Sequence, residues 1–333
     1  MTGSVAGQTR ATGRTELRLP QRCKLAASMY VSEQEVRAVL TYEALIPAIR
    51  EALIDYSAGR VNQPPRMILR AGNAEDHRNG WFGVMPVVAR DVMGVKTVTF
   101  YAGNDELGLH THMAIIELIR RETGEPLALM DGRLITEMRT AAVSAAAFAG
   151  IAPLHFESAP TSFGIIGSGV QARAHIAALR IVWPEMGEIR IASRKASNAT
   201  KLAEEVGARA VPVEEAAAAD VVLTATTSPV AVLEGRWLKA NALVLAVGAS
   251  GASVRELDDE AMLSSYVVAE GRSCVERESG DVILSGAKVR TEIGEILADP
   301  STAKIPRDQR IVFKSVGMAI EDITAARLVW QSL

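Results

Sequence analysis

The stretch from Phe163 to Ala172 has the residue types and spacing of a dinucleotide-binding turn. It reads as a short apolar strand, then the glycine pattern Gly167-x-Gly169-x-x-Ala172, then a helix from Gln171 to about Val182. In such a turn the first glycine permits the tight bend and the second lets the backbone approach a pyrophosphate. The start of the helix offers free N–H groups and a positive dipole end to the anion. A structural glycine turn in another α/β protein is the alternative interpretation.

The residues after the next predicted strand, Ile189 to Ala192, indicate which dinucleotide is preferred. An NAD site usually carries an acidic residue near this strand end, which holds the 2′-hydroxyl of the ribose. Here the strand ends in Ser193, Arg194 and Lys195, a hydroxyl and two cations. These groups suit the 2′-phosphate of NADP. We therefore predict that NADP(H) is favoured over NAD(H), although a solvated basic strand end would read the same way.

Lys96 is the first candidate for substrate chemistry. In the predicted strand from Val95 to Tyr101, alternation places Lys96 on the same face as Val98 and Phe100. An ammonium group on an apolar face is costly to bury without a partner. It either extends along the strand end to reach water, or points into a substrate cleft, where it could bind a carboxylate or deliver a proton.

Three further residues are candidates with weaker local support. Arg139 is predicted in the first turn of a helix from Thr136 to Gly150, where the helix dipole disfavours a cation. An external anion would satisfy it, and so would a neighbour such as Glu137. Arg66 follows Pro64-Pro65 and begins a predicted strand, and His112 precedes another. A histidine there is as often a surface polar group as an acid–base group.

The elements that position these residues fall into two patterns. The first part of the chain has a capped helix at Ser32 and a second from Thr41 to Gly59. Strands at 66–70, 81–89 and 95–101 and a hairpin over 111–130 follow. From Phe163 strands and helices alternate, with strands near 209–213, 221–225, 242–247 and 266–269, and an amphipathic helix over 311–328 ends the chain.

The alternating pattern predicts an α/β fold with a doubly wound, mostly parallel sheet, a Rossmann domain. We place this domain at 140–303. It is inserted in an α+β substrate-binding and dimerisation domain made from 24–139 and 304–333, after a flexible tail at 1–23.

Composition narrows the classes of function. With 333 residues, 48% hydrophobic and a net charge of −3, the chain resembles a soluble enzyme and gives no reason to expect nucleic acid or membrane partners. Its two cysteines, Cys23 and Cys274, suggest neither a disulfide framework nor a metal site. No apolar run is expected to cross a membrane, and the polar first 20 residues lack the apolar core of a secretory signal. We predict a cytoplasmic protein without a metal.

The chain resembles the ornithine cyclodeaminase/mu-crystallin family from about Met29 to Trp330. Motifs at 63–66, 94–96, 130–132, 139–144 and 167–172 carry the match. The more telling motifs lie at 247–250, 255–258, 279–287 and 313–319, and the last three are closer to the mu-crystallin, or ketimine reductase, branch.

The resemblance implies a homodimer and a set of site residues. Arg66, Lys96 and Arg139 would hold the carboxylate of an imino or amino acid substrate. The cofactor would be lined by Thr111, Arg139, Gly167, Gly169, Val170, Gln171, Ser193, Arg194, Lys195, Ser250 and Ser315. One position departs from the cyclodeaminases, which carry an acid/base aspartate where this chain has Ser250. A neutral hydroxyl cannot replace a carboxylate as a general base near neutral pH.

Three functions follow from this comparison. The first is NAD(P)H-dependent reduction of ketimine carboxylates, such as pyrroline-2-carboxylate or piperideine-2-carboxylate, which needs alignment and a bound carboxylate rather than an aspartate. The second is an amino-acid cyclodeaminase or an alanine-dehydrogenase-like enzyme, which would need another base. The third is an NADP-dependent binding protein without turnover, although a passive binder has no need of buried cations.

Overall fold

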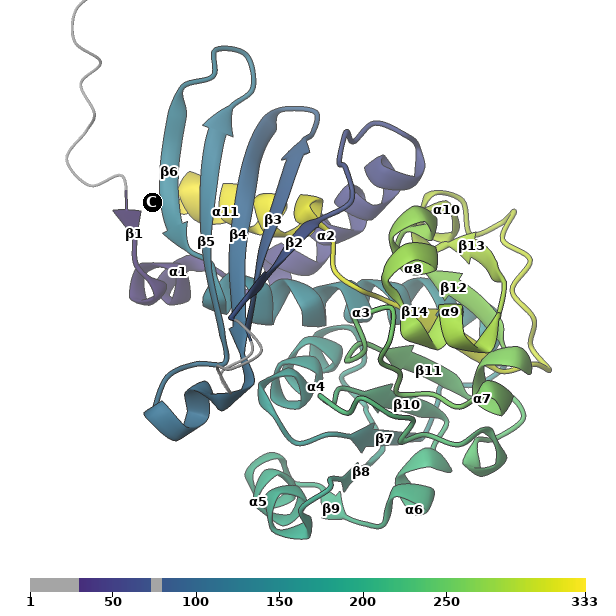
Figure 1. The fold of residues 1–333 in the computed structure, drawn as a ribbon. Coiled ribbons are helices and arrows are strands. Elements are labelled where there is room, and N and C mark those ends of the chain that lie inside the picture. Colours follow the sequence, from purple (N-terminus) through teal and green to yellow (C-terminus); the bar gives the residue numbers. More distant parts are fainter. Residues whose placement is uncertain (1–29, 73–79) are drawn as a thin grey trace, which may run out of the picture.

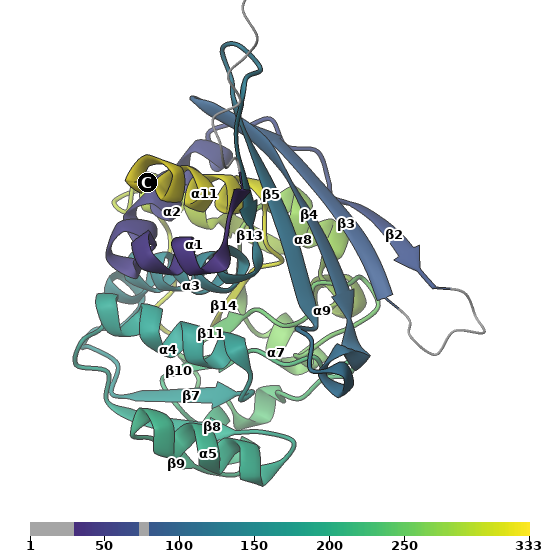
Figure 2. The same cartoon turned by 90° about the vertical axis from the view of Figure 1, so that its left-hand side faces the viewer.

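The chain forms two sheets joined by a shared layer of helices (Figures 1 and 2). The structure, a computed structural model, describes residues 30–72 and 80–333. The predicted flexible tail at 1–23 and Cys23 therefore lie outside the described residues.

The first sheet has six strands and is mainly antiparallel. Its order is β1 (Tyr30–Val31), β6 (Pro126–Asp131), β5 (His112–Arg120), β4 (Val92–Tyr101), β3 (Gly80–Val88) and β2 (Met67–Ala71). Only β1 pairs in parallel, with β6. The predicted hairpin is confirmed, since β5 pairs antiparallel with β6. Between β4 and β5 lies a 3-10 helix, η1 (Ala102–Leu107).

Four helices cover one face of this sheet. They are α1 (Glu33–Val39), α2 (Tyr42–Ser57), α3 (Arg133–His155) and α11 (Ala319–Ser332). The predicted capping box is present, because Ser32 and Glu35 each bind the other's backbone N–H. Figure 1 shows α11 behind the strands, and this helix packs on β3, β4 and β5. The opposite face of the sheet carries no helix among the described residues.

The second sheet is parallel throughout, where a mostly parallel sheet was predicted. Its order is β13 (Val289–Glu292), β12 (Tyr266–Ala269), β14 (Ile311–Lys314), β11 (Leu243–Ala246), β10 (Val221–Thr224), β7 (Ser162–Ile166), β8 (Glu188–Ala192) and β9 (Arg209–Ala210). The remaining helices are α4 (Val170–Val182), α5 (Ala196–Val206), α6 (Val213–Ala217), α7 (Asp259–Leu263), α8 (Arg272–Glu278), α9 (Gly280–Ser285), α10 (Ile293–Ala298) and the 3-10 helix η2 (Gly235–Trp237). A doubly wound Rossmann sheet beside an α+β part is therefore the fold of this chain.

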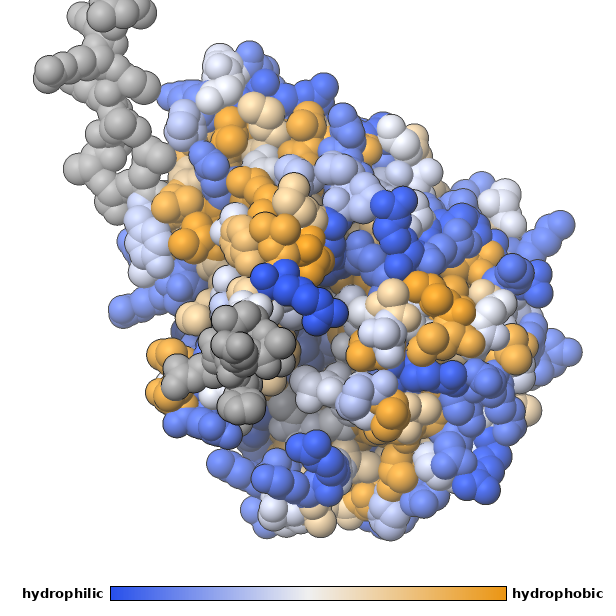
Figure 3. All heavy atoms as spheres, in the orientation of Figure 1, coloured by the Kyte–Doolittle hydropathy of each residue, from blue (hydrophilic) through white to orange (hydrophobic). Residues whose placement is uncertain are grey.

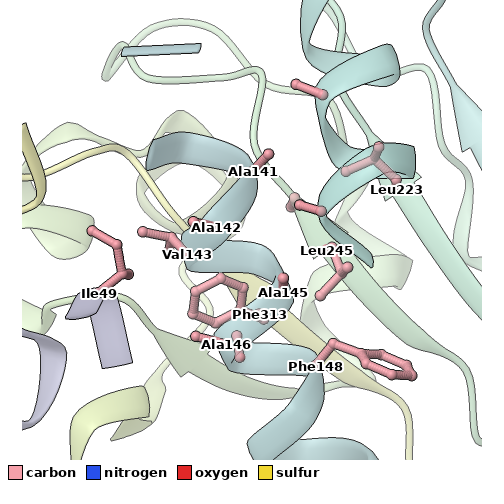
Figure 4. Close-up of a cluster of buried hydrophobic side chains, with 14 of the residues drawn as sticks. Ile49, Ala141, Ala142, Val143, Ala145, Ala146, Phe148, Leu223, Leu245 and Phe313 are labelled. Carbon is pink, nitrogen blue, oxygen red and sulfur yellow. The ribbon is translucent and has the colours of Figure 1, made fainter. Parts of the chain in front are cut away.

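Helix α3 is the core element that both parts share. Its small alanines let it pack closely against the parallel sheet, where Leu223, Leu245 and Phe313 meet it (Figure 4). Ile49 of α2 approaches it from the other side. By length and composition α3 could span a membrane, contrary to the expectation from the sequence, but 67% of its most apolar stretch is buried inside the protein. It is the central helix of the core.

Three predictions about elements need correction. The helix expected over 311–328 is wrong at its start, because Ile311–Lys314 is strand β14 between β11 and β12 and the helix begins at Ala319. The predicted border at 303/304 therefore places one strand of the parallel sheet in the other domain, and the border at 139/140 falls inside α3. The strand near 209–213 has only two residues, and α6 begins at Val213.

Candidate active site

The glycine turn has the geometry that a dinucleotide needs. Gly167 has a φ of 129°, and a Cβ there would lie 2.4 Å from the carbonyl oxygen of Ala225, so only glycine fits. A Cβ on Gly169 would meet no described heavy atom within 4 Å, so this glycine faces open space. Helix α4 begins at Val170 directly after it, and Gly169 has no side chain to cap the helix. Free backbone N–H groups and open space therefore meet where a pyrophosphate would bind.

The residues predicted to meet the 2′-phosphate of NADP, Ser193 to Lys195, follow β8 and lie next to this turn. The Ser193 hydroxyl lies 2.8 Å from that of Ser168, which ties the two loops together. Arg194 and Lys195 are exposed, so their charges are free to meet a ligand. Arg173 of α4 was not predicted. It donates to the Ser168 carbonyl at 3.3 Å and pairs with Glu205 at 2.9 Å, which places a third cation beside this edge.

Two further predicted cofactor residues follow neighbouring strands of the same sheet. Ser315 comes directly after β14, is buried, and donates its backbone N–H to the Ala246 carbonyl at 3.1 Å. Ser250 lies in the exposed loop after β11. Ligands of parallel α/β sheets bind at the carboxyl ends of the strands, and the glycine turn and both serines lie at that edge. Thr111, by contrast, precedes β5 in the other sheet, where its carbonyl accepts from the Tyr101 N–H at 3.0 Å.

A buried charged network holds these strand ends in place. Glu256 accepts hydrogen bonds from the Thr226 N–H at 2.6 Å and the Gly248 N–H at 2.7 Å, which links the loops after β10 and β11. Asp281 in turn accepts from the Glu256 N–H at 2.7 Å and pairs with Lys314 at 2.8 Å. All three charged side chains are fully buried. Burial raises the pKa of Glu256, and the charge of Lys314 opposes that rise.

Lys96 is buried and paired. It lies between Met85 of β3 and Ile116 of β5, on the face of β4 that packs on α11. Only 2% of its side chain is exposed, which contradicts the alternative that it reaches water. Its ammonium lies 2.9 Å from a carboxylate oxygen of Asp322 in α11. Burial lowers the pKa of Lys96 to about 8, although Asp322 opposes this shift.

Arg139 is buried beside Lys96, for a reason different from the one predicted. Helix α3 begins at Arg133, so Arg139 lies beyond its first turn and the helix-end argument does not apply. The predicted alternative partner, Glu137, pairs instead with Arg133. Arg139 binds Asp322 at 3.0 Å and Glu321 at 2.6 Å. Burial opposes its charge, but these two carboxylates raise the pKa of Arg139 overall.

Arg66 completes the group of cations. Its guanidinium lies 2.7 Å from Glu278 and donates to the carbonyl oxygens of Val316 and Gly317, both at 2.6 Å. Burial raises the pKa of Glu278, and the charge of Arg66 works against it. Arg66, Met85, Glu278 and Gly317 together line a small cavity. The three residues predicted to hold a substrate carboxylate are therefore brought together by acidic partners.

The loop from β14 to α11 passes through the middle of this cluster. Glu270, at the end of β12, accepts the N–H groups of Val316 and Gly317 at 3.0 and 2.7 Å. Gly317 has a φ of 83°, and a Cβ there would lie 2.8 Å from the Arg139 guanidinium. Only glycine fits at this point.

Aromatic side chains lie farther along the same face as Lys96. Phe100 and His112 are 4.9 Å apart between ring centres, and Trp81 is 5.8 Å from Phe100. Desolvation, with the charges of Lys96 and Arg139, lowers the pKa of His112 to about 4, even though part of its ring is exposed. His112 is therefore neutral at pH 7 and is no proton donor there.

Sequence reasoning missed four acidic residues of this cluster: Glu270, Glu278, Glu321 and Asp322. Glu278 of α8 and Glu321 and Asp322 of α11 are the ion-pair partners of the three cations. Glu270, directly after β12, binds the backbone of the loop between them. Glu278 directly precedes the motif at 279–287, and Glu321 and Asp322 follow the motif at 313–319, so their place beside these motifs was the signal that could have identified them.

Comparisons with known proteins agree with this geometry. The sequence model of the ornithine cyclodeaminase/mu-crystallin family matches residues 27–333. The mouse protein ketimine reductase mu-crystallin is 38% identical over 318 residues, which are 92% of this chain and 97% of the mouse protein.

Two solved structures share the fold over most of their length. Thermococcus litoralis Δ1-pyrroline-2-carboxylate reductase, in complex with NADH and L-proline, is 30% identical with a TM-score of 0.82, covering 91% of this chain and 96% of that one. An archaeal alanine dehydrogenase dimer with bound NAD is 29% identical with a TM-score of 0.83, covering 92% and 95%. The chain therefore belongs to the ornithine cyclodeaminase/mu-crystallin family.

Proposed function

We propose that this protein is an enzyme that reduces the C=N bond of small ketimine carboxylates with a nicotinamide cofactor, giving cyclic amino acids. The observation that carries the proposal is the convergence of Arg66, Lys96 and Arg139 in one buried cluster. Buried cations bind carboxylates strongly because water does not compete. The loop that follows β14, one of the strands of the dinucleotide-binding sheet, runs into this cluster, so a carboxylate held there lies close to the cofactor edge.

The residues of the chain then have separate tasks. The bound nicotinamide supplies the hydride for the carbon of the C=N bond. Arg66 and Arg139 hold the carboxylate and so fix the position of that carbon. Lys96 either shares this task or supplies the proton for the imine nitrogen, and its lowered pKa of about 8 makes proton release easier near neutral pH. The rings of Trp81 and Phe100 make the sheet face beside Lys96 apolar.

We further propose a preference for NADPH over NADH. Arg194 and Lys195 are exposed at the end of β8 with no acidic residue in their place, and Arg173 lies beside Ser168. A 2′-phosphate would find hydroxyl and cationic partners here.

Ser250 separates this function from cyclodeamination. A serine in the exposed loop after β11 cannot act as a general base near neutral pH. The carboxylates near the three cations are already bound to cations or to backbone N–H groups. Reduction needs no such base, whereas amino-acid cyclodeamination does.

A homodimer would bury the open face of the six-stranded sheet. The strand registers place Met67 and Leu69 of β2, Val88 of β3 and Met113 and Ile115 of β5 on this face, and each is exposed. Figure 3 shows apolar side chains gathered there. Exposed apolar faces of this extent usually mark an interface. Sedimentation of the wild type and an Ile115→Lys variant tests this, because the charge should produce monomers.

The function is tested by a spectrophotometric screen of NADPH and NADH oxidation. Pyrroline-2-carboxylate and piperideine-2-carboxylate should be reduced, while ornithine with NAD should release no ammonia and alanine should not be oxidised. Release of ammonia from ornithine would favour the cyclodeaminase, and binding of NADPH without any turnover would favour the binding protein. The predicted cytoplasmic location rests on the sequence alone and needs cell fractionation.

A further inference from the structure

The buried cluster holds more acidic groups than basic ones. Among the described residues its cations are Arg66, Lys96 and Arg139, and its carboxyl groups are those of Glu270, Glu278, Glu321 and Asp322. The other cation near Glu278 is Arg277, which is exposed. Four ionised carboxylates against three cations would leave a net negative charge in a cluster that is largely buried. A site for a carboxylate ligand cannot keep that charge.

In Glu270 and Glu321 one carboxyl oxygen accepts two hydrogen bonds and the other accepts none, so the second oxygen can carry a proton. Asp322 has the same pattern, but its bonded oxygen accepts from two cations, Lys96 and Arg139. Glu270 Oε2 accepts two backbone N–H groups, and Glu321 Oε2 accepts from Arg139 at 2.6 Å and from the Met318 N–H at 3.1 Å. The remaining oxygens, Oε1 of both, are buried with no donor among the described residues. Yet the two carboxyl groups are neighbours, because Glu270 binds the N–H groups of Val316 and Gly317 and Glu321 binds the next one, that of Met318. Two carboxylates cannot hydrogen-bond unless a proton lies between them.

We propose that Glu270 and Glu321 share one proton, and that this proton keeps the cluster neutral so that Lys96 and Arg139 can accept the carboxylate of a substrate. The second half rests on the proposed function, because it takes the ligand to be a carboxylate. The pair acts by positioning: Glu321 orients Arg139, and Glu270 holds the loop at Gly317 against it.

The charges around the pair agree with a retained proton. Burial, together with the adjacent charge of Glu270, raises the pKa of Glu321 well above its ordinary value, while Arg139 of α3 opposes this rise. Asp322 on α11 and Glu278 on α8 add negative charge nearby. Lys96 of β4 and Arg66 add positive charge, but each has its own carboxylate partner. Loss of the shared proton would leave the cluster with a net charge of −1.

The number of protons that the pair holds can be measured without any ligand, from the protons released on unfolding. At about pH 6.5 both carboxyls are ionised in the unfolded chain, so unfolding should release the shared proton. The free energy of unfolding contributed by this proton therefore decreases as the pH rises above the ordinary pKa of glutamate. The contribution is gone once the proton also leaves the folded pair. Glu270→Gln and Glu321→Gln should each reduce the protons released on unfolding by about one, since an amide N–H replaces the proton as donor. Glu276→Gln, an exposed change on α8, should leave the number unchanged.

Contributions from the histidines are common to all these variants and cancel in the comparison. An unchanged proton count in both amide variants would overturn the proposal. Failure of both to fold would also overturn it, because each reproduces the neutral state of the pair.

The role in binding is tested with pyrrole-2-carboxylate, a planar carboxylate that is not an imine. Its dissociation constant with the NADPH-bound protein is measured by calorimetry at about pH 6.5 and pH 9. The amide variants should bind within about threefold of the wild type at the lower pH, and lose less affinity at the higher pH. Lys96, with a pKa of about 8, loses its charge between these two pH values in the wild type and in both amide variants alike. Identical pH dependences would contradict the role in binding. If no imine is reduced while these results hold, the proposed function fails and the shared proton stands.

Discussion

Replacing Lys96 by methionine removes one charge and keeps much of the side-chain volume. The ammonium is buried and bound to Asp322 at 2.9 Å, so its removal leaves a buried carboxylate with one of its two cations. Removing one partner of a buried charge pair costs about 2–5 kcal/mol in binding. At about 1.4 kcal/mol for each factor of ten, kcat/KM should fall by about 30-fold to several thousand-fold. The loss should appear with imine carboxylates of either ring size.

The stability of Lys96→Met should fall less than is usual for a broken buried pair. Such a break costs about 3–5 kcal/mol when it leaves an uncompensated charge. Asp322 keeps Arg139 at 3.0 Å, so we expect about 1.5–3 kcal/mol, the contribution of one charged hydrogen bond. Steady-state NADPH oxidation and urea unfolding measure the two effects, with the exposed change Lys201→Met as control. A folded Lys96→Met protein with kcat/KM within about threefold of the wild type would refute the role of Lys96.

Three other changes test the remaining assignments. Arg194→Asp should raise the KM for NADPH much more than that for NADH, and equal changes would show that Arg194 does not meet the 2′-phosphate. Ser250→Ala should cost about 1 kcal/mol or less in kcat/KM, since a hydroxyl contributes one hydrogen bond; a loss of a hundredfold would make Ser250 part of the chemistry. Because the pKa of His112 is about 4, the pH profile of kcat/KM should be flat from about pH 5.5 to 7, and His112→Asn should not create or remove a limb there.

The sequence predicts those features whose cause is local. The glycine turn, the strand before it and the helix after it are neighbours in the chain, and glycine at 167 is required by its φ. Alternation in β4 predicted that Lys96 points to an apolar face, because the pleat of a strand determines this without reference to any partner. The family resemblance then brought Arg66 and Arg139 into the same site.

The features that depend on distant contacts could not be predicted from the pattern alone. The partners of Lys96 and Arg139 lie in α11, 226 and 183 residues along the chain. Strand β14 was taken for the start of a helix because a run of three apolar residues, Ile311 to Phe313, near a helix fits either structure. Gly317, with its positive φ, is the residue that separates the two.

The proposed reaction is the reduction of a carboxylate-bearing C=N bond by direct hydride transfer from the nicotinamide. The most direct test supplies the enzyme with NADPH carrying deuterium at the transferred position of the nicotinamide, together with piperideine-2-carboxylate, and analyses the product by mass spectrometry. We expect the wild type to form a cyclic amino acid with one deuterium on the carbon that bears the carboxylate, and Lys96→Met to form much less of it. A product without deuterium, or no cyclic amino acid from either ring size, would contradict the proposed reaction.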